Sequence, residues 1–444
     1  MIPVEVRGII EKLNSAGFEG YAVGGCVRDM LIGRTPKDWD ITTNAAPEQV
    51  KALFKRTIDT GIEHGTVTVM IGREGFEVTT YRVDGDYLDG RHPESVTFTS
   101  SLEEDLKRRD FTINAMACDL SGEIVDLFGG RDDLENGIVK CVGDPLERFS
   151  EDALRMMRAI RFSAELGFTI EEKTYEAIKT LAPTIEKISA ERIRDELVKT
   201  IVSDNPGAMR LFYDTGLTSY FLPEFDKMME QEQKTPHHMY TVGEHTVKVM
   251  EGVKRDEVLR IAALLHDVAK PDCFTIDEAG IAHFKGHPKK GAVLAKDILK
   301  RLKFDNALIK SVTALVEWHD YRPEPDEKSI RRAINKVGLE QFPNLFDLKY
   351  ADIYAQSDYY RQAKLDKLDG FKKLYFEIME REECVSLKTL AVSGNDLMQA
   401  GIKPGPQMGE LLNALLSDVL DEPLHNNNEY LIALAKRISF GEGA

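Results

Sequence analysis

The segment YAVGGCVRDMLIGRTPKDWDI, residues 21–41, carries the strongest local pattern in the chain. An apolar run leads into Gly24 and Gly25, and helical periodicity begins near Cys26. Glycine lets the backbone come close to a ligand, and the N–H groups at the start of a helix attract phosphate. Arg28 is placed to add a charge-assisted contact. The segment therefore predicts a strand, a tight turn and a helix that together bind a phosphate group, with Gly25 and Arg28 among the contacts.

Two aspartates, Asp38 and Asp40, close the same segment. Residues i and i+2 of a strand point to one face, so we expect these carboxylates to lie side by side. Like charges repel unless a cation separates them, and Mg²⁺ prefers oxygen ligands and substrate phosphates. Cations at such a site activate an attacking hydroxyl and neutralise a leaving pyrophosphate. A third carboxylate would complete the site, and Glu77 in FEVTTYRV (76–83) is favoured over Asp110.

The chain changes character near Gly143, Asp144 and Pro145. Before this point, short β-branched and aromatic runs alternate with helical periodicity, and after it the strand signal nearly vanishes. Strands are expected at 21–25, 66–71 and 76–83, and helices at 3–14, 47–56, 150–166, 171–181, 190–202, 244–269, 289–302, 306–317, 328–336 and 359–379. The pattern predicts an α/β or α+β unit followed by an all-helical region.

The composition excludes several classes of protein. With 444 residues, of which 42% are hydrophobic, the chain has enough apolar material for about two to four folded domains. No apolar run approaches the roughly 20 residues of a membrane span, and the five cysteines form no C-x-x-C pair. The charged N-terminal segment does not resemble a signal peptide, so we expect a cytoplasmic protein without membrane contact. The formal net charge of −17 argues against a non-specific nucleic-acid binder but leaves room for one local basic groove.

A basic helical pattern follows the break, in EDALRMMRAIRF (151–162). On one helix, Asp152, Arg155 and Arg158 would lie roughly along one face, where a plain surface salt bridge is the alternative interpretation. Asp152 can accept from the amino group of cytosine or adenine while Arg155 donates to the neighbouring ring nitrogen. Uracil and guanine present the reverse pattern and would leave buried polar groups unpaired, which costs roughly 1–3 kcal/mol per group. This pair would therefore select C and A.

Four segments, 21–41, 76–82, 108–117 and 151–162, resemble the class II tRNA nucleotidyltransferase and bacterial poly(A) polymerase family, which includes the CCA-adding enzymes. The resemblance covers roughly residues 1–220. It implies an α+β fold with a polymerase-β-like head and an all-helical neck, body and tail. The residues that match the family's motifs are Asp38 and Asp40 for Mg²⁺, Arg109 and Asp110 for ribose and nucleotide binding, and Glu151, Asp152 and Arg155 for base selection, with Arg158 as support for the base pocket or the triphosphate.

A Gly-rich and acidic segment, DGDYLDGRHP (84–93), follows the strand that carries Glu77. This composition predicts a mobile loop that acts as a lid. In the family that the sequence resembles, the corresponding loop is required for the final A addition and is shortened in enzymes that add only CC. Its full length here favours complete CCA addition.

The second half of the chain contains an ordered set of histidines and aspartates. His245, His266, Asp267 and Asp352 follow the H…HD…D pattern and resemble the HD phosphohydrolase superfamily, and His287 and His319 fit the extra histidines of some members. Imidazole and carboxylate ligands suit a transition metal such as Mn, Ni, Fe or Zn. Such a metal lowers the pKa of bound water for phosphoester hydrolysis. A metal-stabilised fold without turnover is the alternative.

These patterns together predict four regions, namely a nucleotidyltransferase head (1–143), a helical neck and body with the base-selecting helix (144–234), an HD-type metal domain (235–358) and a helical tail (359–444). The expected function is Mg²⁺-dependent CCA addition to tRNA from CTP and ATP. The alternatives are a poly(A) polymerase, an enzyme that adds only A or only CC, and a metal phosphohydrolase with a vestigial head. A tRNA-binding module without catalysis is the least favoured. Nothing in the sequence predicts the oligomeric state.

Overall fold

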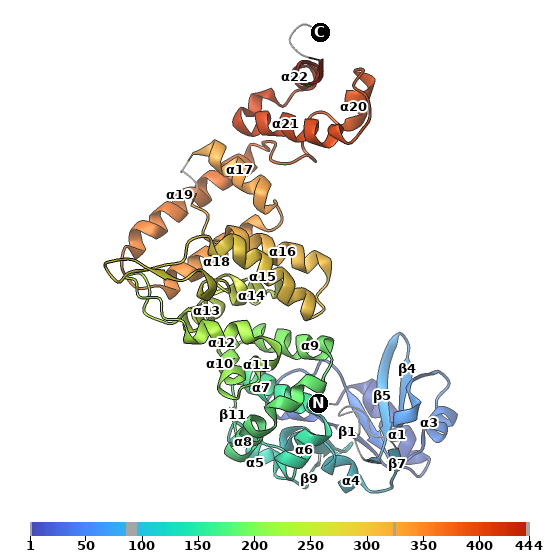
Figure 1. Ribbon diagram of the computed structural model, residues 1–444. Coiled ribbons are helices and arrows are strands. Elements are labelled where there is room, and N and C mark those ends of the chain that lie inside the picture. Colours follow the sequence, from blue (N-terminus) through green and yellow to red (C-terminus); the bar gives the residue numbers. More distant parts are fainter. Residues whose placement is uncertain (1, 86–95, 323–325, 441–444) are drawn as a thin grey trace. The chain divides into compact units, whose positions relative to one another are not determined.

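The computed structural model describes residues 2–85, 96–322 and 326–440. The chain forms two compact units, Met1–Pro223 and Glu224–Ala444 (Figure 1). In the described ranges, no helix is both long and apolar enough to span a lipid bilayer. The predicted segment 84–93 lies outside the described residues from position 86 onward.

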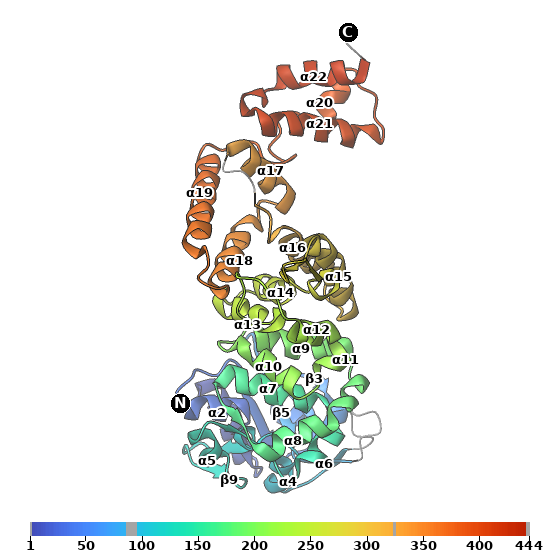
Figure 2. The same cartoon turned by 60° about the vertical axis from the view of Figure 1, so that its left-hand side comes forward.

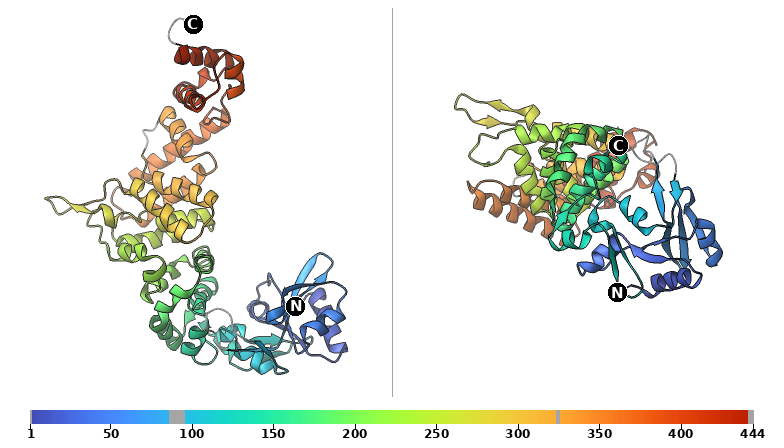
Figure 3. Two further views of the ribbon diagram at one scale, coloured as in Figure 1. Left: turned by 45° about the vertical axis from the view of Figure 1, so that its right-hand side comes forward. Right: turned by 90° about the horizontal axis from the view of Figure 1, so that it is seen from below.

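The first unit is built on a seven-stranded sheet with the order β3-β4-β5-β2-β1-β8-β9 (Figure 3). The strands and helices of this sheet domain are β1 (Gly20–Val23), β2 (Asp40–Thr43), β3 (Thr57–Gly61), β4 (Thr66–Ile71), β5 (Glu74–Thr80), β6 (Arg82–Asp84), β7 (Val96–Phe98), β8 (Met116–Cys118), β9 (Ile124–Asp126), α1 (Val4–Ser15), α2 (Gly25–Leu31), α3 (Pro47–Leu53), α4 (Leu102–Lys107) and α5 (Gly130–Glu135). β2 and β5 run parallel, whereas β1 pairs antiparallel with both β2 and β8. Val23, Leu106 and Ala117 form a buried cluster at the centre of this arrangement.

Helices then complete the first unit. They are α6 (Pro145–Glu151), α7 (Leu154–Leu166), α8 (Glu172–Leu181), α9 (Ala190–Ile201), α10 (Met209–Asp214) and α11 (Thr218–Phe221), with a short strand pair β10 (Ile138–Val139) and β11 (Thr169–Ile170). The Asp144 carboxylate caps α6 by accepting from the backbone N–H of Leu146 at 2.7 Å. Pro145 occupies the first turn, where a backbone N–H has no partner within the helix and its absence therefore costs no hydrogen bond. The change of character predicted near Gly143, Asp144 and Pro145 therefore coincides with the start of α6.

Within its described residues, the second unit is helical apart from a hairpin, β12 (Thr275–Ile276) and β13 (Ala282–His283), which projects from the helices in Figure 3. Its helices are α12 (Pro223–Glu230), α13 (Val242–Gly252), α14 (Glu257–Leu265), α15 (His287–Arg301), α16 (Asn306–Trp318), α17 (Glu327–Val337), α18 (Phe342–Ala355), α19 (Arg361–Glu380), α20 (Gly394–Gln399), α21 (Gln407–Asp421) and α22 (Asn428–Phe440). Figure 2 shows α21 and α22 lying against each other. The predicted α+β class, with a sheet-containing head and a helical remainder, is confirmed.

Two predicted helices are divided in the structure. The helix expected at 150–166 is broken at Asp152, whose backbone is extended (φ −139°, ψ 104°). The helix expected at 244–269 is two helices, α13 and α14, because Asp256 begins a new one by accepting from the N–H of Leu259 at 2.9 Å. Periodicity alone missed both breaks, since apolar residues continue in phase across them.

Candidate active site and candidate metal centre

Three carboxylates, Asp38, Asp40 and Glu77, gather around the start of the interior strand β2, and we call this group the carboxylate edge. Asp40 is the first residue of β2 and stands beside Glu77 of β5 in the parallel register. Side chains that are directly opposite on neighbouring strands point to the same face. Asp38 lies in a bend before β2 and not on the strand, so the expectation that both aspartates belong to one strand is wrong. All three residues are exposed to solvent.

The three carboxylates influence one another electrostatically. Loss of surrounding water raises the pKa of Glu77, and the charges of Asp40 and Asp38 raise it further. The pKa of Asp40 is also raised, first by loss of water, although the positive charge of Arg109 opposes the effect and Asp38 adds to it. In the described part of the chain, groups of three metal-ligand atoms within 4.8 Å of one another occur in the second unit only, so these three carboxylates are more widely spaced. Hard oxygen donors with raised pKa values suit a divalent cation such as Mg²⁺.

The turn between β1 and α2 positions the basic residues of this edge. Gly24 has φ +82°, and its N–H donates to the Met116 carbonyl at 3.1 Å. A Cβ atom at Gly24 would lie 2.9 Å from Nη1 of Arg109, so the guanidinium occupies the space that a side chain would need. Gly25 is the first residue of α2. Arg28, which we expect to contact phosphate, donates to Asn114 Oδ1 at 2.8 Å and to Asp29 Oδ1 at 2.7 Å.

A buried aspartate that the sequence analysis missed organises the two arginines at 108–109. Asp105 on α4 is fully buried and accepts from Nε and Nη2 of Arg108 at 2.9 and 2.8 Å. Its second oxygen lies 3.5 Å from Nη2 of Arg109 and accepts from the hydroxyl of Thr42 at 3.1 Å. Burial lowers the pKa of Arg109, while the charges of Asp105 and Asp40 oppose that change. The spacing i, i+3 and i+4 of Asp105, Arg108 and Arg109 is typical of ion pairs on a helix and could have indicated these contacts from the sequence.

Asp110 connects the sheet domain to α7. One of its oxygens accepts from Nε and Nη2 of Arg158 at 2.8 and 2.6 Å, and the other accepts from the N–H of Phe111 and from Asn114. Burial alone would raise the pKa of Asp110, but the charge and hydrogen bonds of Arg158 lower it to about 2. Both oxygens of Asp110 are therefore engaged within the protein, which favours Glu77 over Asp110 as a third metal ligand.

The residues expected to select the base each have a protein partner of opposite charge. Arg155 donates to Glu151 Oε2 at 2.5 Å and to the carbonyls of Arg148 and Arg108 at 3.1 and 3.3 Å. Asp152 lies between α6 and α7 and pairs with Nη2 of Arg192 on α9 at 2.8 Å. The expectation that Asp152, Arg155 and Arg158 share one helix face is wrong, because Asp152 is outside the helix. No sequence spacing pointed to Arg192, which lies 40 positions from Asp152.

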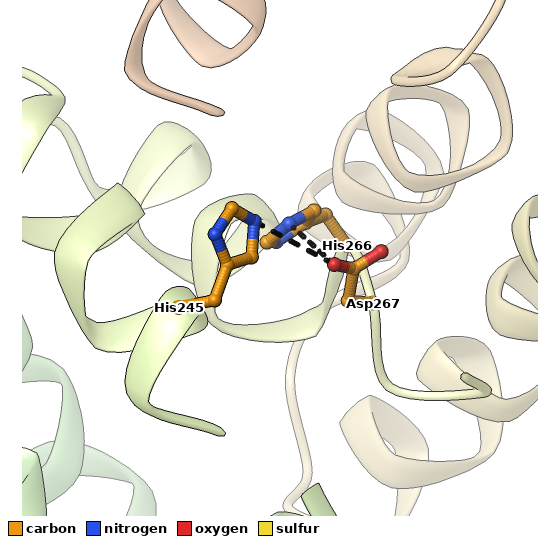
Figure 4. A group of neighbouring side chains, drawn as sticks. All are labelled: His245, His266 and Asp267. Carbon is orange, nitrogen blue, oxygen red and sulfur yellow. Dashed lines mark ion pairs between the residues drawn. The ribbon is translucent and has the colours of Figure 1, made fainter. Parts of the chain in front are cut away.

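The histidines and aspartates of the second unit converge around Asp267. His245 lies on α13, His266 and Asp267 directly follow α14, His287 begins α15, His319 directly follows α16 and Asp352 lies on α18. Nε2 of His245 is 3.7 Å from Asp267 Oδ2 and 2.9 Å from Asp352 Oδ1, and Nε2 of His266 is 3.1 Å from Asp267 Oδ2. Figure 4 shows both imidazoles directed at the same oxygen of Asp267. All six predicted residues are thus brought together.

The second ring nitrogen of each histidine is held by the backbone. Nδ1 of His266, His287 and His319 donates to the carbonyls of Ala263, Phe284 and Val316 at 2.8, 2.7 and 2.7 Å. Nδ1 of His245 lies 3.4 Å from the Ala355 carbonyl. Such bonds orient the ring and leave Nε2 as a lone-pair donor, which is the usual arrangement of histidine at a metal. Nε2 of His245 and Nε2 of His266 are buried and lie 3.7 and 3.1 Å from Oδ2 of the buried Asp267, so these residues fit a transition metal.

Basic residues complete the surroundings of Asp267. Nζ of Lys270 lies 2.7 Å from Asp267 Oδ2 and 2.9 Å from Gln233 Oε1. Although burial opposes the effect, the charges of His266 and Lys270 hold the pKa of Asp267 well below its usual value. A cavity of about 340 Å³ lies at the cluster, and its lining includes Lys270, Arg322 and Lys364. Cations beside a cluster of metal ligands suit a phosphate group.

Models of known families match three stretches of the chain. The model of the poly A polymerase head domain matches residues 20–140, and the model of a probable RNA and SrmB-binding site of polymerase A matches residues 167–229. A model of tRNA nucleotidyltransferase domain 2 matches residues 287–435. The first of these stretches contains Asp38, Asp40 and Glu77.

Curated relatives match nearly the whole chain. A CCA-adding enzyme of Enterococcus faecalis is 38% identical over 98% of this chain and 95% of its own, and one of Ligilactobacillus salivarius is 37% identical over 97% and 95%. The crystal structure of a CCA-adding enzyme of Bacillus stearothermophilus in complex with CTP has a TM-score of 0.74 and 31% identity, over 99% of this chain and 98% of the other. A Thermotoga maritima CCA-adding enzyme complexed with tRNA shares the fold at 21% identity and a TM-score of 0.59, over 98% and 96% of the two chains. The chain therefore belongs to the family of CCA-adding enzymes.

Proposed function

We propose that this chain adds CCA to the 3′ end of tRNA from CTP and ATP, at the carboxylate edge of its first unit. The observation that carries the proposal is the placement of Asp40 beside Glu77, with Asp38 close enough to raise the pKa of both. Relatives of 37–38% identity over almost the entire chain are CCA-adding enzymes, which favours CCA addition over the poly(A) alternative. The cytoplasm is the expected compartment of the reaction.

Asp38 and Asp40 are the residues that would hold Mg²⁺, with Glu77 as the third carboxylate. When bound, such a cation lowers the pKa of the attacking 3′-hydroxyl and neutralises the leaving pyrophosphate. Arg109 lies within electrostatic reach of Asp40 and is placed to bind the nucleotide at the same edge. Gly24 keeps the space for this guanidinium, and Gly25 presents backbone at the start of α2. Arg28 acts through Asn114, which it holds against Asp110.

Asp152 and Arg155 are the residues that would read the base. Asp152 accepts from the amino group of cytosine or adenine, and Arg155 donates to the adjacent ring nitrogen. Arg192 pairs with Asp152 and Glu151 pairs with Arg155, and these contacts orient the two side chains. Arg158 pairs with Asp110, so we assign it a supporting role beside Asp152 and Arg155. Asp152 and Arg155 would then be the residues that contact the base.

We further propose that the second unit hydrolyses phosphoesters at the cluster around Asp267, as an HD-type metal domain spanning 235–358 between the helical body and a tail at 359–444. The convergence of buried imidazole Nε2 atoms on the carboxylate of Asp267 supports a bound Mn, Ni, Fe or Zn ion. His245, His266, Asp267 and Asp352 would hold the metal, which when bound supplies an activated water. Lys270, Arg322 and Lys364 would bind the phosphate in the adjoining cavity.

Asp40→Asn should reduce nucleotide addition by at least about 10³-fold, because it removes several kcal/mol of transition-state stabilisation that depends on the metal. The measurement is a product ladder at single-nucleotide resolution on tRNA that lacks the CCA end. The unchanged protein should add CC with CTP alone and CCA with CTP and ATP. Glu77→Gln should also impair addition, whereas Glu74→Gln on the same strand should not. A poly(A) tail with ATP alone would contradict the proposed function.

The raised pKa of Asp40 predicts a pH-dependent cost in stability. Folding raises the pKa of Asp40, so the folded state binds this proton more tightly than the unfolded chain does. The free energy of unfolding therefore falls as pH rises from the pKa of an unfolded aspartate, about 3.9, through the higher pKa of the folded state. Asp40→Asn removes the charge and should raise Tm in EDTA at neutral pH. The difference should shrink as pH falls below that range. An unchanged or lower Tm at neutral pH, measured by calorimetry, would count against electrostatic repulsion at this edge.

Asp152→Asn should weaken the discrimination between CTP and UTP. The amide can donate to the uracil carbonyl and no longer repels it, so the unpaired-group cost of roughly 1–3 kcal/mol is lost, which is about 5- to 150-fold in selectivity. The ratio of kcat/KM for the two nucleotides is the measurement. Asp195→Asn, an exposed aspartate on the neighbouring α9, serves as the control. Retention of full selectivity by the Asp152 variant would exclude the proposed role.

His266→Ala and Asp267→Asn should abolish hydrolysis of bis(p-nitrophenyl) phosphate and p-nitrophenyl phosphate in the presence of Mn²⁺ or Ni²⁺, because both remove metal ligands. CCA addition should remain within about threefold of the unchanged protein, since the sites lie in different units. His425→Ala alters a histidine that pairs with Asp418 at 2.7 Å outside the cluster and is the matched control. Hydrolysis that survives in both ligand variants would refute the second function.

A further inference from the structure

We propose that Asp105 is a positioning residue for the carboxylate edge, because it holds Arg109 near Asp40 and keeps that guanidinium from pairing with a carboxylate that would bind Mg²⁺. This role rests on the proposed Mg²⁺ site of the first unit and deepens it. Asp105 is not one of the residues proposed to bind the metal or the base, so it would act through Arg109.

Asp105 is fully buried and gathers three side chains around its carboxylate. Its Oδ1 accepts from Nε and Nη2 of Arg108 at 2.9 and 2.8 Å. Its Oδ2 accepts from the hydroxyl of Thr42 at 3.1 Å and lies 3.5 Å from Nη2 of Arg109. Although burial raises the pKa of Asp105, the charges of the two arginines lower it overall. A buried, ionised carboxylate therefore joins α4 to β2 and to both arginines.

The contact with Thr42 fixes how far along the sheet Arg109 lies. Thr42 and Asp40 are two residues apart on β2, so their side chains share one face and are separated by roughly 6.6 Å along the strand. Asp105 and Arg109 are four residues apart, which corresponds to about 6 Å along a helix axis. The two spacings agree, and the charge of Arg109 acts on Asp40 as this alignment requires.

Arg109 is confined on two sides. Within the described residues, Asp105 is the only carboxylate at ion-pairing distance from its guanidinium. On another side, a Cβ atom at Gly24 would lie 2.9 Å from Nη1, so the turn between β1 and α2 limits the movement of the side chain. Asp40 lies farther away than an ion pair but within electrostatic reach. Arg109 therefore stays near Asp40 without pairing with it.

Stability alone explains this arrangement poorly. Desolvation offsets the attraction between buried charges, so apolar side chains of similar volume often replace a buried ion pair or triad without loss of stability. Asp105 and the two partly buried arginines form such a group. What apolar side chains could not provide is a fixed position for the positive charge of Arg109 beside the carboxylate edge.

Loss of the Asp105 charge would change the partner of Arg109. The other anions that act on Arg109 are Asp40 and Asp110, and Asp110 is already engaged by Arg158. Arg109 would therefore turn toward Asp40 and pair with it. A divalent cation could then bind Asp40 only by displacing the guanidinium. We expect this competition to weaken metal binding about tenfold, which is the scale of one charge-assisted hydrogen bond.

The test is the Mn²⁺ affinity of the full chain, measured from the EPR signal of free Mn²⁺. Binding by the carboxylate edge is the part that Asp40→Asn removes. Asp105→Asn should raise the Kd of this part about tenfold. It should raise the Mg²⁺ concentration for half-maximal CTP addition by a similar factor, whereas the rate at saturating Mg²⁺ should change much less. Glu103→Gln, which alters an exposed acid on the same helix, should change none of these values.

A double-mutant cycle separates positioning from general destabilisation. If Asp105 acts through Arg109, Asp105→Asn should raise the Mn²⁺ Kd when Arg109 is present but not in an Arg109→Gln background. A purely structural role would affect both backgrounds alike. An unchanged Kd in Asp105→Asn, or an equal rise with and without Arg109, overturns the inference.

Thr42→Val provides a second test if circular dichroism shows that Asp105→Asn does not fold. It removes the hydroxyl from which Asp105 accepts, so the Mn²⁺ Kd should rise by a smaller factor, again only when Arg109 is present. No rise in this variant overturns the inference.

The binding measurement also separates this inference from the proposed function. A rise in Kd that depends on Arg109 supports the positioning role even if the chain adds no nucleotide to tRNA. Normal CCA addition without such a rise leaves the proposed function intact and refutes the role of Asp105. Mn²⁺ binding that Asp40→Asn does not alter would count against both.

Discussion

The parallel pairing of β2 with β5 is the constraint on which the head depends. It places Asp40 directly beside Glu77 in the middle of a sheet that is otherwise antiparallel around them. Burial of the neighbouring Ile41 and Val78 anchors that register, because a shift by one residue would turn these apolar side chains to the opposite face. The mutual repulsion of the carboxylates is thus opposed by the sheet core, and the site holds its charges together before any cation binds.

Buried ion pairs extend from this edge to the base-selecting residues. Asp105 holds the arginines at 108 and 109, and the Arg108 carbonyl accepts from Arg155. Asp110 next binds Arg158 on α7. Such pairs contribute little net stability, since desolvation offsets their attraction, but the loss of one partner leaves a costly unpaired charge. Their consequence is geometric, because the residues proposed to bind the nucleotide and the residues proposed to read its base belong to one connected network.

Residue chemistry and spacing predicted a sheet-containing unit followed by helices, and the acidic pair Asp38 and Asp40. The resemblance to known families supplied the expected roles of Arg109 and of the six residues of the Asp267 cluster, which the structure brings together. Local order was harder to predict. Asp152 was assigned to a helix because apolar residues continue in phase on both sides of it, and only its extended backbone reveals the break. Arg192 and Gln233 were missed because their partners are distant in sequence, so no periodicity connects them. The contact of Arg28 with Asp29 joins adjacent residues, whereas its contact with Asn114 joins residues 86 positions apart and could not be identified before folding.

The position of Asp152 between α6 and α7 has a consequence for how one side chain could serve two different bases. A residue inside a helix is held by hydrogen bonds four positions away in both directions, so any rotation of its backbone strains a whole turn. Asp152 lies between α6 and α7 with an extended backbone, outside both helices, and its carboxylate accepts from the N–H of Leu154 at 3.0 Å. A purine is larger than a pyrimidine, so the proposed reading of both bases would require the carboxylate to shift with the amino group, and a position between two helices would allow that shift with less strain than a position inside one.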